Sequence, residues 1–270
     1  MQNWQCSECR PVYWSFNQGT PYTGIAYSQT LPSPPYEQQS LSEFAAAVST
    51  TTGGITRYGN DCSGFVSLAW RLGTRYATPG FESDATAPGG YVTSRGAIGH
   101  AQNTILLSGD ALVKSGDHMV LFKERIATGI QTREQTADPY RTTPGAKYKD
   151  WTWSQLQSYR PIRRNLIDET VYTGNLSASG QSGWQPNELS YYSSASGVHS
   201  GRLGGPNNNA DFDLYLYKWD WISSSWQSVA SSLKTFASES IDYIGAPGYY
   251  IWKISSYSGS GNYELSIKKP

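Results

Sequence analysis

The sequence has few charged residues, and their signs balance. Only 16% of the 270 residues are charged, with 21 basic and 21 acidic side chains. Because no basic patch stands out, the long-range attraction that drives nucleic-acid binding is missing. There is also no apolar run of roughly 18 residues, the length that a membrane-spanning helix needs. We therefore expect neither a nucleic-acid partner nor a membrane span.

An export signal is also missing. Residues 1–5 (Met-Gln-Asn-Trp-Gln) contain neither a charged start nor an apolar core, so they are not a signal peptide as they stand. Yet the low charge and the 27 glycines are typical of exported, β-rich proteins. We expect a secreted or cell-envelope protein whose signal peptide has been removed.

Cysteine is scarce, with only Cys6, Cys9 and Cys62 in the chain. A structural zinc site would need a second cysteine pair or histidines beside the Cys-x-x-Cys of the first two. We expect these two to form a local disulfide or to be idle thiols, and we expect no metal and no cofactor. Cys62 is the odd cysteine and hence the candidate for chemistry.

Oxygen-rich side chains in the second half raise the question of calcium. Residues 207–209 are asparagines, and Asp211 and Asp213 follow them. Calcium accepts such ligands, but turns rich in Asn and Asp are common without metal. We therefore expect no calcium site.

Aromatic residues are abundant, at 14% of the chain, which argues against disorder. Composition changes near residue 166, and from there on short β runs alternate with turns, as in a β-sandwich. We predict an α+β domain over residues 1–165, a linker over 166–180 and an all-β, jelly-roll-like sandwich over 181–270.

The first domain has a helix signal followed by strand signals. Phe65, Leu68 and Leu72 recur at helical spacing, which predicts a helix that starts at or near Cys62. The next segment, from Arg75 to Asn103, is loop-like. Strands are expected over residues 110–113, 118–122, 130–136 and 159–164, with a short helix over 151–158.

A cysteine at a helix start has one of the two devices that activate a thiol, and a nearby imidazole would be the other. Of the three histidines, His199 lies in the β-rich tail and His100 in a loop-like segment. His118 opens a buried apolar strand, where a polar group is costly unless it is paired. We expect His118 to be the base; the alternative is a core or rim histidine bonded to backbone.

The base in such sites is usually oriented by a third group. The strand over residues 130–136 could pair with the His118 strand, and Glu134 is its best candidate. The alternative is an exposed carboxylate paired with Arg133 or Arg125.

Three segments of the chain resemble the NlpC-type cell-wall cysteine peptidases. They are residues 61–66 (Asp-Cys-Ser-Gly-Phe-Val), 108–113 (Ser-Gly-Asp-Ala-Leu-Val) and 117–122 (Asp-His-Met-Val-Leu-Phe). The resemblance covers roughly residues 40–165. It implies a pared-down papain-like α+β fold and cleavage of the peptide stems of peptidoglycan.

The same resemblance implies roles for further residues. Glu134 falls at the third catalytic position, where the family often has His, Asn or Gln. Tyr58 matches a tyrosine near the substrate and the oxyanion. Asp61 and Ser63 flank the nucleophile and are expected to contact substrate.

The tail resembles the pre-peptidase C-terminal domains of secreted bacterial enzymes. Residues 210–217, 248–251 and 257–263 carry this likeness, which implies an extracellular setting and a domain that aids secretion, is cleaved off or binds a surface. Trp219, Trp221 and Trp226 could stack on sugar rings, but tryptophans of a sandwich belong more often to its core, and we expect them there.

Together these observations predict a cysteine hydrolase that cleaves amide bonds in peptidoglycan stem peptides through a thioester. One alternative on the same fold is an acyltransferase or a different amidase. Another is a non-catalytic cell-surface protein whose C-terminal domain binds a glycan or a protein.

Overall fold

The structure is a computed structural model, and it describes most of the chain beyond residue 60. The described residues are 4–5, 15–16, 61–70, 72, 76–136, 147–165, 169–206 and 210–270. Tyr58, Cys6 and Cys9 therefore lie outside the described residues, as does the asparagine run 207–209.

The described chain is mostly β, with several antiparallel sheets and few helices. Its helices are α2 (Cys62–Ala69), α3 (Thr78–Thr86) and the 3-10 turn η2 (Ala101–Asn103). Its first strands are β1 (Trp4–Gln5), β2 (Ser15–Phe16), β3 (Val92–Ser94), β4 (Ala111–Lys114), β5 (His118–Ile126), β6 (Gly129–Glu134), β7 (Lys147–Thr152) and β8 (Arg160–Arg164). None of the helices described is long and apolar enough to cross a membrane.

The remaining strands build the second half of the chain. They are β9 (Thr170–Leu176), β10 (Ser182–Gln185), β11 (Tyr191–Ser193), β12 (Gly197–Gly204), β13 (Asp211–Asp220), β14 (Ser225–Ser232), β15 (Ser238–Gly245), β16 (Gly248–Ser258) and β17 (Gly261–Lys268).

The chain groups into two compact units, each made of several stretches. The first contains Met1–Gly90, Ala111–Leu121 and Thr132–Lys149, and the second contains Tyr91–Asp110, Phe122–Gln131 and Asp150–Pro270. The first unit therefore includes α2, α3, β4, the start of β5 and the end of β6. The second includes β3, β8 and every strand from β9 onward.

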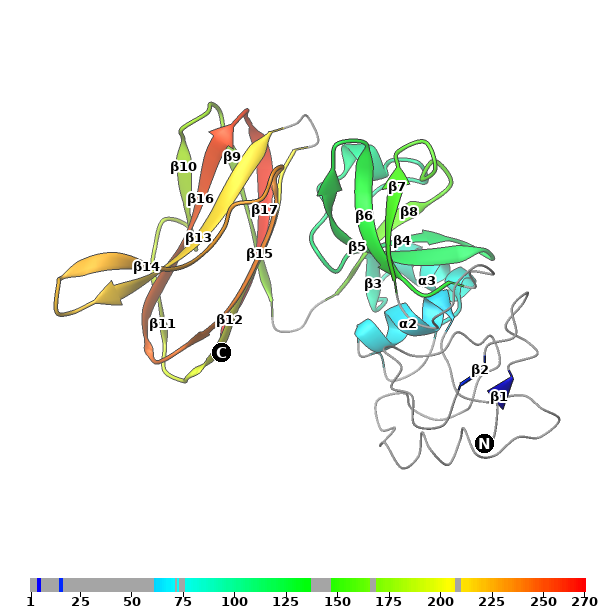
Figure 1. Ribbon diagram of the computed structural model, residues 1–270, viewed down its shortest axis with the longest axis horizontal. Coiled ribbons are helices and arrows are strands. Elements are labelled where there is room, and N and C mark those ends of the chain that lie inside the picture. Colours follow the sequence, from blue (N-terminus) through cyan, green and yellow to red (C-terminus); the bar gives the residue numbers. More distant parts are fainter. Residues whose placement is uncertain are drawn as a thin grey trace. The chain divides into compact units, whose positions relative to one another are not determined.

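Strands β3 to β8 form a six-stranded sheet with the order β3-β8-β4-β5-β6-β7 (Figure 1). Strands β4 and β5 pair antiparallel, with Lys114 opposite His118. Met119, Val120, Leu121 and Phe122 are all buried, which explains why this stretch of β5 is continuously apolar. The strand predictions over 110–113, 118–122, 130–136 and 159–164 are confirmed.

Two local predictions in this region are wrong. The segment from Arg75 to Asn103 contains α3, β3 and η2. Helix α3 begins with Pro79 in its first turn and buries only Thr78, Phe81 and Ala85. Because so few of its residues are apolar and buried, its sequence lacks the hydrophobic periodicity that predicts a helix. The predicted helix over 151–158 is instead the end of β7 followed by turns, because Trp151 is buried as a strand residue.

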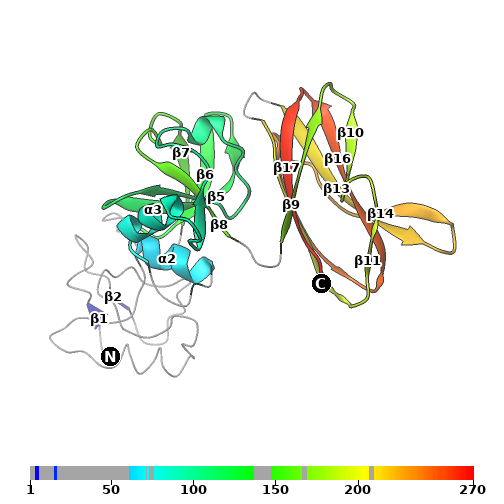
Figure 2. The same cartoon turned by 180° about the vertical axis from the view of Figure 1, so that it is seen from behind.

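The second unit contains a β-sandwich (Figures 1 and 2). One sheet has the order β10-β16-β13-β14, with β11 also paired to β16, and the other has the order β15-β12-β17-β9. Alternate residues of β13, namely Phe212, Leu214 and Leu216, are fully buried and share one core with residues of the opposite sheet such as Leu203 and Leu265. Residues 170–176, which we expected to belong to a linker, form β9 and pair with β17.

A histidine lies inside the sandwich core. His199 is 0% exposed; its Nδ1 lies 2.8 Å from the hydroxyl of Tyr191, and its ring centroid is 4.0 Å from that of Tyr250. Among the described residues, its Nε2 has no hydrogen-bond partner. Burial, together with the charge of Lys218, lowers the pKa of His199 to about 4.

This histidine makes the sandwich sensitive to acid. Between pH 6.5 and about 4, the unfolded chain protonates His199 while the folded chain does not, so folding stability falls as pH falls through this window. We expect a loss of about 1–3 kcal/mol in the wild type. Chemical unfolding at pH 7 and at pH 4.5, followed by tryptophan fluorescence, measures this loss.

The comparison variant is His199→Phe, which removes the titrating imidazole. Its free energy of unfolding should therefore depend less on pH between 6.5 and about 4. Glu239 changes stability in the opposite direction, since burial raises its pKa to about 7. The difference between wild type and variant is therefore the quantity to compare. An equal pH dependence in both proteins would contradict the assignment.

Candidate functional site

The start of helix α2 is fixed by a capping carboxylate. Asp61 precedes the first helical residue, Cys62, and its Oδ1 accepts a 2.7 Å hydrogen bond from the amide of Gly64. The first helical bond runs from the amide of Phe65 to the carbonyl of Asp61 at 2.9 Å. This is the N-cap arrangement that Asp favours. It confirms the predicted helix start and puts Cys62 in the first turn.

Asp61 and Ser63 are both occupied at this helix start. The hydroxyl of Ser63 donates to Asp61 Oδ1 at 3.1 Å, and both side chains are buried. Both side chains therefore have a structural role, because their hydrogen bonds close the first turn of α2 around Cys62. Their contact with a substrate stays a prediction.

His118 faces Cys62 from the start of strand β5. Cys62 is a free cysteine, 7% exposed, and its thiol lies close enough to the imidazole of His118 to influence the pKa of the imidazole. Burial alone would lower the pKa of His118. Favourable interactions with Cys62 and with the Glu134 carboxylate outweigh this and raise the pKa of His118 to about 9.

Glu134 lies on the other side of the imidazole, at the end of strand β6. Its Oε2 is 3.6 Å from His118 Nε2, and its side chain is 0% exposed. The hydroxyl of Thr132 lies 3.5 Å from the same carboxylate and donates to the carbonyl of Lys149 at 3.1 Å. Glu134 is therefore not the exposed carboxylate of the alternative reading.

Two lysines of strand β7 accompany Glu134, and the sequence analysis missed both. The Nζ atoms of Lys147 and Lys149 lie 4.0 Å and 3.9 Å from Glu134 Oε1. Alternate residues of a strand share a face, so β7 presents both ammonium groups to one carboxylate. The sequence signal that could have identified these two lysines is the Lys-x-Lys pattern of β7, an edge strand of the sheet.

The structure thus brings together three of the predicted site residues: Cys62, His118 and Glu134. The other two histidines belong to the second unit: His100 is exposed beside η2, and His199 is buried against Tyr250 in the sandwich. Among the described residues, no group of three or more His, Cys, Asp and Glu side chains is arranged to hold a metal ion.

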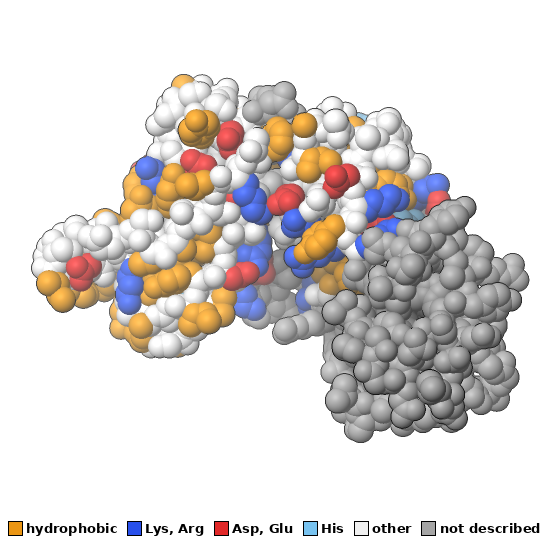
Figure 3. Space-filling view, viewed as in Figure 1, with side chains coloured by type: hydrophobic (Ala, Val, Ile, Leu, Met, Phe, Trp, Pro, Cys, Tyr) orange, Lys and Arg blue, Asp and Glu red, His pale blue; other side chains and the backbone are white. Residues whose placement is uncertain are grey.

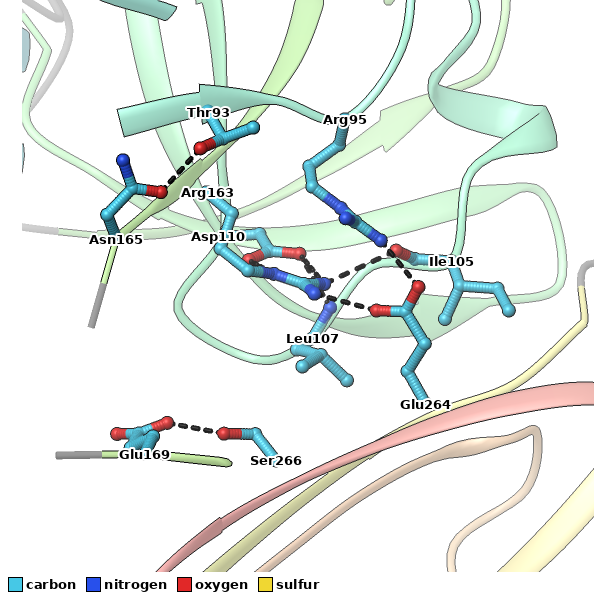
Figure 4. Close-up of polar contacts among 10 residues, drawn as sticks. All are labelled: Thr93, Arg95, Ile105, Leu107, Asp110, Arg163, Asn165, Glu169, Glu264 and Ser266. Atoms are coloured by element: carbon cyan, nitrogen blue, oxygen red, sulfur yellow. Dashed lines mark hydrogen bonds and ion pairs between the residues drawn. The ribbon is translucent and has the colours of Figure 1, made fainter. Parts of the chain in front are cut away.

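The Gly-Asp segment before β4 has a different role. The carboxylate of Asp110 accepts the amide of Leu107 at 2.8 Å and pairs with Arg163 through two hydrogen bonds of 2.6 Å and 2.7 Å. Arg163 also donates to Glu264 at 2.6 Å, and Arg95 donates to the same carboxylate at 2.5 Å (Figure 4). Asp110 therefore anchors a turn and an ion-pair network.

No protein-family model matches the chain. Among solved structures, the mitogen of Yersinia pseudotuberculosis is 20% identical over 39% of this chain and 88% of its own, with a TM-score of 0.31. The pre-peptidase C-terminal domain of a Bacillus anthracis collagenase is 17% identical over 37% and 89%, with a TM-score of 0.31. The protein Ly7917 is 12% identical over 82% and 81%, with a TM-score of 0.20. Likenesses this distant assign no activity to the chain.

The capping bond of Asp61 can be tested directly. Replacing Asp61 by Ala removes the acceptor for the Gly64 amide and should destabilise the start of α2 by about 1 kcal/mol. Hydrogen exchange of the Gly64 and Phe65 amides measures this as faster exchange. Asp61→Asn keeps an acceptor and serves as the matched control; equal exchange in the two variants would contradict the capping role.

Proposed function

We propose that the protein is a cysteine hydrolase that cleaves amide bonds, with Cys62 as nucleophile, His118 as general base and Glu134 as the residue that orients the imidazole. Its substrates are the stem peptides of peptidoglycan, and its working place is outside the cell or in the envelope. The resemblance of residues 61–66, 108–113 and 117–122 to the NlpC-type peptidases supports the substrate class and a papain-like arrangement of the first domain.

One observation carries this proposal: the imidazole of His118 lies between a thiol and a buried carboxylate. An imidazole in hydrogen-bond contact with a thiol can accept its proton, and a carboxylate on its far nitrogen fixes the ring and stabilises the imidazolium. The 3.6 Å separation between His118 and Glu134 is long for a hydrogen bond, as is common before substrate binds.

The reaction follows from this geometry. His118 takes the proton of the Cys62 thiol, and the sulfur attacks the scissile carbonyl carbon. Backbone N–H groups at the start of α2 stabilise the oxyanion. The imidazolium then gives its proton to the leaving amine as the C–N bond breaks. Water, activated by His118, hydrolyses the thioester and restores the thiol.

A second candidate uses the same residues. In an acyltransferase or a different amidase, an amine other than the peptide's own resolves the thioester, and the fold does not distinguish the two. Adding an amine to the reaction separates them, since a transferase yields the corresponding amide. A non-catalytic surface protein would leave Cys62 unreactive.

Cys62→Ala should abolish turnover without unfolding the protein, because the side chain that is lost is small. Mass spectrometry of purified muropeptides, incubated with wild type or with the variant, measures the released fragments. We expect cleavage by wild type and a loss of at least about a thousandfold in the variant, since the proposed mechanism depends on the sulfur of Cys62 as nucleophile.

Circular dichroism provides the folding control for this variant. The reaction with iodoacetamide at pH 6 is an independent check: Cys62 should be alkylated faster than a free thiol, with the labelled peptide identified by mass spectrometry. A fully active Cys62→Ala protein would end the proposal.

The raised pKa of His118 gives a pH dependence. Above pH 9 the imidazolium loses its proton and can no longer protonate the leaving amine, so kcat/KM should fall on the alkaline side with an apparent pKa of about 9. In Glu134→Gln, one of the two anionic neighbours is gone. The alkaline limb should then move to lower pH by about one pH unit.

Glu188→Gln is the matched control, because Glu188 is an exposed carboxylate of the second unit and its loss should leave the profile unchanged. An alkaline limb at the same pH in wild type and in Glu134→Gln would show that Glu134 does not act on the imidazole. Thermal unfolding of both variants distinguishes this result from misfolding.

A further inference from the structure

The outer side of the five-stranded sheet carries aromatic rings. In β13, Phe212, Leu214 and Leu216 point into the sandwich core, so Tyr215, Tyr217 and Trp219 alternate with them on the outer side. Pairing places Trp226 of β14 opposite Trp219, Trp184 of β10 opposite Lys253 of β16, and Tyr192 of β11 opposite Tyr249 of β16.

We call this surface the aromatic face; its main members are Trp184, Tyr192, Tyr217, Trp219, Trp221 and Tyr249. An antiparallel sheet with one side in solvent normally places polar residues there. Here aromatic residues lie among the polar ones of the outer side. Trp221 is 71% exposed, Tyr192 58% and Tyr249 41%, and hydrophobic side chains form bands over the lobe that contains β13 and β14 (Figure 3).

The rings form two connected rows. In the first, the centroids of Trp184 and Tyr217 are 5.5 Å apart, and the ammonium group of Lys253 lies 5.7 Å from the Trp184 ring. In the second, Tyr192 lies 5.0 Å from Tyr249, Tyr249 lies 6.2 Å from Trp221, and Trp221 lies 6.0 Å from Trp219. The rings are inclined to one another, by 55° between Trp184 and Tyr217, 74° between Tyr249 and Trp221 and 81° between Trp221 and Trp219, so each ring would offer its face to a separate sugar unit.

The hairpin that presents Trp221 is held in place by its own turn. The β13–β14 hairpin extends beyond the other strands of its sheet (Figure 1). At its tip, the carboxylate of Asp220 accepts the amides of Ile222 and Ser223 at 3.2 Å each, and the hydroxyl of Ser223 at 2.6 Å. The backbone that carries Trp221 is thus held in place, which reduces the entropy that ordering this turn would cost on binding.

Charge and ring type indicate the partner. On the outer side, Lys253 is offset by Asp213, whose carboxylate accepts the Tyr215 hydroxyl at 3.3 Å. Residues 219–227 contain Asp220 and no cation, so the tip lacks the basic residues that attract nucleic acid or anionic lipid. Tryptophan and tyrosine combine an apolar ring face with a polar edge, which matches sugars with their C–H faces and hydroxyl rims.

We propose that the aromatic face binds an extended, uncharged, β-linked glycan by stacking sugar rings on its tryptophan and tyrosine rings. The polar edges of the tryptophan and tyrosine rings supply partners for the glycan hydroxyls. This proposal is independent of the chemistry at Cys62.

Isothermal titration calorimetry of the full chain with cellohexaose and with chitohexaose tests the proposal. Trp221→Ala and Tyr249→Ala each remove an exposed ring from the face, and each should weaken binding about tenfold. Tyr91→Ala is the matched control, because Tyr91 is 62% exposed and lies outside the face. Thermal midpoints of all three variants should match that of the wild type.

Binding of either hexaose that is weakened by the two face variants and unchanged by Tyr91→Ala supports the proposal. Three results overturn it: no binding of either sugar at millimolar concentration, an equal loss in the control, or face variants that reduce a different interaction. That different interaction could be binding to phosphatidylcholine vesicles, which the exposed side chain of Ile222 would favour. It could also be self-association, which sedimentation velocity measures.

Discussion

A half-buried imidazole between a thiol and a carboxylate is the interaction on which the candidate site depends. It requires three elements to meet: the first turn of α2, the first residue of β5 and the last residue of β6. Each position is fixed by something local. The carboxylate of Asp61 caps α2, the pairing of Lys114 with His118 sets the start of β5, and Thr132 holds Glu134 toward β7. Loss of any one would move a reacting group.

The acidic residue at the third position becomes understandable from the lysines beside it. A fully buried carboxylate is costly unless counter-charges and hydrogen bonds surround it. Lys147 and Lys149 supply that charge to one oxygen of Glu134, while the other oxygen faces His118. A neutral amide at this position would orient the ring without such support, so the acid and the two lysines form one unit.

Sequence reasoning succeeded where a feature is local and failed where it depends on pairing. Helix α2 was predictable because its apolar residues have helical spacing, and Cys62, His118 and Glu134 were proposed together from their chemistry and their order along the chain. Lys147 and Lys149 were missed because residues 137–146 separate them from Glu134 along the sequence, and only strand pairing brings them together. Helix α3 was missed because its apolar stripe is nearly limited to Phe81 and Ala85.

The sandwich strands were predictable, but the side on which the aromatics lie was not. In the second half of β13, Tyr215, Tyr217 and Trp219 alternate with Leu214 and Leu216, so both sets of residues there can be buried and the period-two pattern is weak. The sequence therefore favoured the sandwich core for the three tryptophans of the β13–β14 hairpin. The structure decides between these readings because Phe212, Leu214 and Leu216 fill the core and leave the rings outside.

The chain has few charged residues, so the partners of its poorly exposed carboxylates can be compared one by one. Asp110 and Glu264 are bound to Arg163, whose guanidinium keeps its proton because hydrogen bonds to both carboxylates raise its pKa despite burial. This network fixes the turn before β4 through Asp110 and links it to Glu264 (Figure 4). Glu134 instead faces the imidazole of His118, whose pKa is raised to about 9. Of these three carboxylates, the one that faces an imidazole is therefore the one in the candidate site.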